Sequence, residues 1–125
     1  MVSRPLLLVA SLCLATLTAG CQTAPPAPYS ELHDKVANGE MVPVADLRES
    51  FRHDIALPER MERLMELEAQ ALQLVEDEPL KLGSIGSAIL DTYQASITGH
   101  YVMSRFYEHV ATEEAAATHL DWLAR

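Results

Sequence analysis

Residues 58–75, which read PERMERLMELEAQALQLV, contain the strongest secondary-structure signal in this chain and decide its fold. Pro58 favours the first turn of a helix, and Glu59 places negative charge at the positive end of the helix dipole. Apolar side chains recur every three or four residues, which predicts one buried face. That predicted face comprises Met61, Leu64, Met65, Glu68, Ala71, Leu72 and Val75, with Leu67 and Leu74 beside it. The helix is expected to end near Glu78, because Pro79 disfavours helical geometry before it.

Helical spacing continues on both sides of this stretch. Before it, residues 30–37 form a short candidate helix that closes at Asn38-Gly39, and residues 43–53 form a second one. After it, the spacing runs from Ser84 until Gly99 interrupts it. It resumes over residues 101–110, and an alanine-rich segment runs from residue 113 onward. We therefore predict an all-α fold, a small array or bundle of antiparallel helices over residues 30–125.

The C-terminal third has the residue pattern of a helix-turn-helix repeat. The residues that carry this pattern are Gly99, His100, Tyr101, Met103, Phe106, Tyr107, Val110, Ala111, Ala116 and Leu120. They resemble tetratricopeptide and Sel-like repeats, although Met103 stands where those repeats have a small residue. The resemblance covers about one and a half units from Gly83, and such arrays normally need at least three. Two alternatives follow: a helical hairpin within a small bundle, or the N-terminal part of a longer repeat array.

The N-terminus has the three parts of a secretory signal. Arg4 is the only charge before an apolar run over residues 6–17, and the small residues Thr18-Ala19-Gly20 precede Cys21. The apolar run is shorter than the roughly 20 residues that a membrane-spanning helix needs. We predict a cleaved signal peptide over residues 1–20.

The stretch Leu17-Thr18-Ala19-Gly20-Cys21 resembles the lipobox of bacterial lipoproteins, with leucine four rather than three residues before the cysteine. The resemblance implies cleavage just before Cys21 and acyl chains such as palmitate on that residue, which together would hold the protein firmly on a membrane. With Gln22 rather than aspartate next, it also implies the outer membrane, facing the periplasm, rather than the inner membrane. The alternative is an ordinary cleaved signal that leaves Cys21 as a free thiol. Residues 21–29 are rich in proline and predict a semi-rigid tether.

The composition narrows the classes of partner. The leader holds one of the nine basic residues and none of the eighteen acidic ones, so the body keeps eight basic and eighteen acidic residues and a net charge of −10. That balance argues against nucleic-acid binding, which relies on Lys and Arg to neutralise phosphates. Cys13 lies in the leader, so no pair of cysteines remains to form a disulfide.

No pattern of catalytic residues is present. The five histidines are His33, His53, His100, His109 and His119. None stands three or four residues from another, the spacing that places two metal ligands on one helix face, so we expect half-exposed surface histidines and no metal or cofactor. The chain has no Gly-x-Ser-x-Gly elbow. Residues 83–87, GSIGS, lack the lysine of a phosphate-binding loop and are expected to cap a helix and let it pack closely.

The aromatic residues of the C-terminal third are the remaining candidate site. Tyr101, Tyr107 and Trp122 are candidate partner-binding residues, because Tyr and Trp are enriched at protein interfaces. The alternative is that these rings belong to the core. The resulting hypothesis is a lipid-anchored helical adaptor or scaffold that binds another envelope protein or peptide. The alternatives are an accessory or maturation factor of an envelope complex and a small metal-dependent enzyme.

Overall fold

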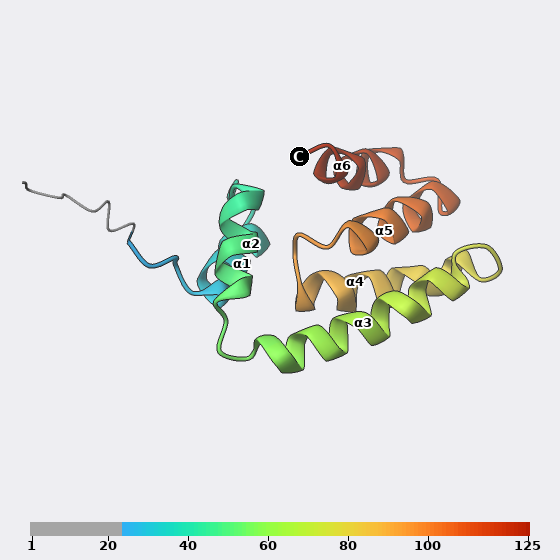
Figure 1. The fold of residues 1–125 in the computed structure, drawn as a ribbon. Coiled ribbons are helices and arrows are strands. Elements are labelled where there is room, and N and C mark those ends of the chain that lie inside the picture. The colour runs from blue at the N-terminus through green and yellow to red at the C-terminus, as the bar shows by residue number, and fades with distance from the viewer. Residues whose placement is uncertain (1–23) are drawn as a thin grey trace, which may run out of the picture.

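A computed structural model describes residues 24–125 (Figure 1). The predicted signal peptide over residues 1–20 and Cys21 lie outside the described residues. Within residues 24–125 the regular elements are all helical, which confirms the predicted all-α fold class. They are α1 (Tyr29–Ala37), α2 (Val44–Arg52), α3 (Leu57–Leu74), the 3-10 turn η1 (Pro79–Lys81), α4 (Leu82–Thr92), α5 (Ile97–His109) and α6 (Glu113–Leu123).

The helices form two groups that meet at one end of the molecule. Helices α3 to α6 run back and forth in sequence order and stack as an antiparallel array, and α1 and α2 form a pair beside one end of it (Figure 1). Each group has its own apolar cluster: Leu47 and Phe51 are buried in the α1–α2 cluster, and Leu82 and Ile89 in the array. Tyr93 packs against both clusters and therefore joins the two groups.

The break between α4 and α5 lies at residues 93–96 and not at Gly99, so the predicted interruption at Gly99 is wrong. The backbone N–H of Gly99 donates to the Ser96 side chain at 2.9 Å, which caps the first turn of α5. A Cβ on Gly99 would lie 2.7 Å from Leu90 Cδ2. Gly99 therefore brings α5 close to α4 rather than ending a helix.

The glycines of α4 serve the same purpose, as expected for residues 83–87. A Cβ on Gly83 would lie 2.8 Å from the Phe106 ring, and one on Gly86 would lie 2.5 Å from Met103 Sδ. The large Met103 side chain thus fills the space that Gly86 leaves, and close packing of α4 against α5 is confirmed. The expected N-terminal cap is absent: Ser84 donates to the Lys81 carbonyl instead.

The buried face of α3 is narrower than predicted. Leu64 and Ala71 are buried against the array, whereas Leu72 is 54% exposed and Met65 is exposed as well. Because α3 is the outermost helix of the array, only one side of its apolar stripe is covered. The prediction that Leu72 belongs to the buried face is therefore wrong.

The folded body begins before residue 30. Tyr29 is buried in the α1–α2 cluster and Ala27 packs against it, so the end of the predicted tether belongs to the fold. At the other end of α1, Gly39 has a φ of +81°, which agrees with the predicted stop at Asn38-Gly39. None of the helices within residues 24–125 is long and apolar enough to cross a membrane.

Candidate functional site

A groove of about 500 Å³ runs between α2, the first two thirds of α3, and the α4–α5 loop with the first turn of α5. Its volume lies in the range of typical ligand and peptide-anchor pockets. The groove is lined by Arg48, Phe51, Arg52, Met61, Leu64, Glu68, Tyr93, Ala95, Ser96, Ile97 and Thr98. It lies where the two helix groups meet, so its walls come from residues far apart in the sequence.

The floor of the groove is apolar and firmly packed. Phe51 and Tyr93 stack with ring centroids 4.2 Å apart, and Leu64 and Ala95 are buried below the opening. Part of the rim is apolar as well, because the side chain of Ile97 is 69% exposed there. An exposed apolar side chain beside a preformed apolar floor is typical of a surface that binds another apolar group.

The two sides of the groove carry opposite charge. Arg48 and Arg52 lie one turn apart on α2, and Glu68 lies across from them on α3. Six of the eight lysine and arginine side chains in residues 24–125 form ion pairs, and within that range Arg48 forms none. Burial raises the pKa of the Tyr93 hydroxyl, and the Arg48 guanidinium beside it acts in the opposite direction. Arg48 thus has a neutral phenol rather than a carboxylate as its neighbour.

The α4–α5 loop that forms one wall is held from two sides. The Gln94 backbone N–H donates to the Tyr29 hydroxyl at 2.8 Å, and His100 Nε2 lies 2.8 Å from the Gln94 carbonyl oxygen. The Ser96 hydroxyl donates to Glu68 Oε1 at 2.6 Å and ties the loop to α3. The groove is therefore formed before any partner binds, which lowers the entropic cost of binding.

His100 and His119 form a pair between α5 and α6. Their Nδ1 atoms are 2.9 Å apart. Trp122 stacks on His100 with centroids 4.8 Å apart, and Tyr107 stacks on His119 at 5.6 Å. The expectation of half-exposed surface histidines is wrong for His100, which is only 2% exposed.

The hydrogen bonds of this pair determine where its protons lie. Because a carbonyl oxygen only accepts, His100 Nε2 carries the hydrogen and, in the neutral ring, its Nδ1 accepts from His119 Nδ1. The pKa of His100 is lowered to about 4, mainly by burial; the hydrogen bond to the Gln94 carbonyl acts against this shift, and the neighbouring His119 and Arg125 add to it. Burial also lowers the pKa of His119. The lone pair of His100 Nδ1 is thus already engaged, and residues 24–125 contain no group of three side chains arranged to hold a metal.

The three aromatic residues predicted to bind a partner do not share one surface. Tyr107 and Trp122 are half-buried in the histidine stack, and Trp122 also packs against the α1–α2 cluster. Tyr101 is exposed on α5. The structure therefore uses Tyr107 and Trp122 to hold α6 in place, and it does not bring the three rings together.

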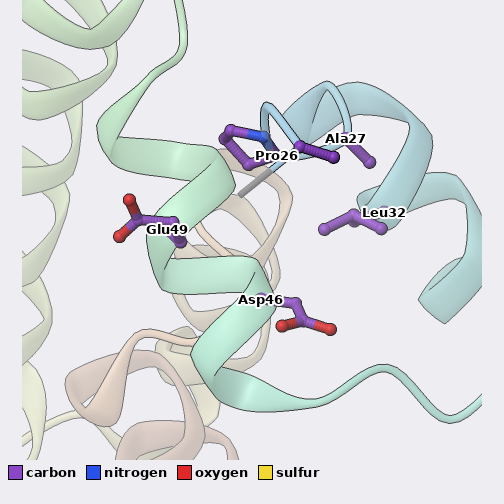
Figure 2. Close-up of a pocket in the computed structure, with 6 residues that line it drawn as sticks. Pro26, Ala27, Leu32, Asp46 and Glu49 are labelled. Atoms are coloured by element: carbon purple, nitrogen blue, oxygen red, sulfur yellow. The ribbon is translucent and has the colours of Figure 1, made fainter. Parts of the chain in front are cut away.

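A second depression, of about 410 Å³, lies between α1, α2 and the segment before α1 (Figure 2). Pro26 and Ala27 form one side, Leu32 lies on α1, and Asp46 and Glu49 lie on α2 (Figure 2). Glu49 already forms an ion pair with Arg52 at 3.0 Å. Leu32 is the one buried apolar side chain named in its lining, whereas the groove has three, Phe51, Leu64 and Ala95, so the groove is the better candidate site.

Comparison with known proteins identifies no relative: no family model, no curated protein and no solved structure matches this chain. The function is therefore inferred from the residues and geometry of the chain itself.

Proposed function

We propose that this protein is a lipid-anchored adaptor of the bacterial cell envelope that docks a partner protein in the groove between α2, α3 and the α4–α5 loop. The anchor is the acyl-modified Cys21, and the protein is located on the periplasmic face of the outer membrane. The single observation that carries the docking role is the preformed apolar groove with opposite charges on its two sides. Antiparallel helix arrays that bury one face and present another serve as docking surfaces in repeat proteins.

The proline-rich segment supports the proposal that the lipid anchors the protein while the groove docks the partner. Residues 22–28 contain three prolines among small residues, which favours an extended spacer between the lipid and the first helix. Such a spacer lets a membrane-held domain reach a partner while its local concentration near the membrane stays high. The anchor and the groove therefore act together.

Replacing Cys21 with serine is expected to abolish acylation, because the thiol is the acceptor of the lipid. In bacteria grown with an alkyne-tagged palmitate, the wild-type protein should carry the tag, and the Cys21→Ser variant should carry none and migrate at the mass of the uncleaved precursor. Cys13→Ser is the matched control, since Cys13 leaves with the leader. A tag that persists in Cys21→Ser would contradict the anchor.

A photocrosslinking residue at Ile97, on the rim of the groove, is expected to capture one dominant envelope protein in living cells. Leu120 is the matched control, because it is 48% exposed on α6 at the opposite edge of the array from α3 (Figure 1). The same capture from both positions, or from neither, would contradict docking in the groove.

A further inference from the structure

We propose that the groove binds a short segment of its partner in which one apolar side chain is flanked by an acidic residue on the α2 side and by a basic or amide group on the α3 side. This proposal rests on the proposed docking function and specifies the chemistry of the partner. It follows from three features of the groove: its apolar floor, the free charge of Arg48 and the carboxylate of Glu68.

The apolar floor selects the central side chain. Phe51, Leu64 and Ala95 are buried beneath the opening, and the exposed Ile97 borders it. An apolar side chain of the partner would contact this floor and cover Ile97, so apolar area on both molecules would leave water. The volume of about 500 Å³ fits one or two side chains, not a folded domain.

The α2 side selects an acidic neighbour. The net charge of the body is −10, so most of its surface repels acidic partners. Arg48 is a local exception, because its guanidinium forms no ion pair within the described part of the chain and lies beside the neutral Tyr93 hydroxyl. A partner carboxylate would give Arg48 the bidentate pairing that guanidinium groups favour.

The α3 side selects a hydrogen-bond donor. Glu68 Oε1 accepts from Ser96, and within residues 24–125 the second carboxylate oxygen has no hydrogen-bond donor. A backbone N–H or a lysine of the partner would satisfy that oxygen. A fatty acid, by contrast, has one charged group and no donor, so Glu68 would oppose its binding. The two charged sides together therefore favour a peptide over a lipid.

The test is selection from a library of random peptides against the lipidated full-length protein in detergent micelles. Wild-type protein should enrich peptides that place Asp or Glu within two positions of Leu, Ile, Met or Phe. The Arg48→Glu variant should bind these peptides about tenfold more weakly, because a like charge replaces the partner of the carboxylate. Selection on Arg48→Glu should instead enrich Lys or Arg at that position.

Ile97→Asp is the control for the groove itself. Arg48 and Ile97 are both exposed, so neither variant should change the melting temperature. Peptides selected by wild type should lose binding to Ile97→Asp and keep it to the distant Leu120→Asp.

Any of three results would overturn the proposal. The first is that wild-type protein enriches no peptides relative to Ile97→Asp, and the second is that wild type and Arg48→Glu select the same peptides. The third result is displacement of the selected peptides by laurate at low concentration. If one of these occurs while a crosslinker at Ile97 still captures an envelope protein in cells, the partner chemistry is wrong and the adaptor function stands. If the crosslinker also captures nothing, the docking function fails as well.

Discussion

Replacing Ala71 with aspartate is expected to unfold the domain, whereas the same replacement at the neighbouring Leu72 is expected to leave it folded. Ala71 is fully buried where α3 packs on the array, among Leu64, Leu82 and Ile89. Aspartate there would bury an unpaired charge and crowd a packed site, at a cost of at least about 3 kcal/mol. Domains of this size have only about 5 to 15 kcal/mol of stability, so the loss is large.

Leu72 is one residue further along α3 and lies on the exposed side, at 54% exposure. Aspartate at this position changes only the helix propensity and some surface contacts, so the expected loss is less than about 1 kcal/mol. Urea unfolding followed by far-UV circular dichroism measures both variants. A folded Ala71→Asp protein, or an unfolded Leu72→Asp protein, would show that the array covers the other side of α3.

Acid is expected to destabilise the protein through His100. Its pKa is about 4 in the folded protein, against about 6.5 in an unfolded chain, because burial disfavours the charged ring. Between these two values the unfolded state binds a proton that the folded state does not. Stability is therefore fully present above pH 6.5 and falls as the pH decreases towards 4, by about 1.4 kcal/mol per pH unit and roughly 3 kcal/mol in total.

A His100→Gln variant separates this contribution from the titration of carboxylates. The variant should be less stable than wild type at pH 7.5, because the hydrogen bond to His119 is changed, yet its stability should fall less steeply between pH 6.5 and 4.5. Urea denaturation at several pH values gives the slopes, and His109→Gln controls for loss of an exposed imidazole. Equal slopes in wild type and His100→Gln would contradict a neutral buried His100.

Helix positions are largely local properties of the sequence, and most of them could be predicted from it. Prolines and glycines mark the ends of several helices: Pro58 lies in the first turn of α3, and Asn38-Gly39 closes α1. Ala111, with a φ of +57°, turns the chain between α5 and α6, where the sequence places a break. Such signals depend only on residues that are adjacent in the sequence.

Packing partners are not local, and the errors arise there. Glycine is common in turns, but the position of Gly99 within α5 depends on the close approach of Leu90 from α4. Leu72 fits the apolar period of α3, but no other element covers that side of the helix. Helical period alone does not reveal which side of an outermost helix is buried.

Neither the histidine pair nor the groove could be predicted from the sequence, because each combines residues from different helices. The histidine pair joins residues 19 apart, so a search for histidines three or four apart on one helix misses it. The sequence offers no local signal for this pair, because His100 lies 11 residues before the turn at Ala111 and His119 lies 8 residues after it. The groove combines α2, α3 and the α4–α5 loop, and the apolar residues that line it look like ordinary core positions in the sequence.

Crosslinking from position 97 in anchored and unanchored protein tests the central claim most directly. In one strain residues 1–21, the proposed leader and Cys21, are kept; in the other they are replaced by an ordinary cleavable secretory leader without the cysteine. We expect one dominant captured protein from position 97 in the anchored strain, sharply reduced capture without the anchor, and no such capture from position 120 in either strain. Equal capture with and without the anchor, or from both positions, would contradict an adaptor that combines a lipid anchor with docking in the groove.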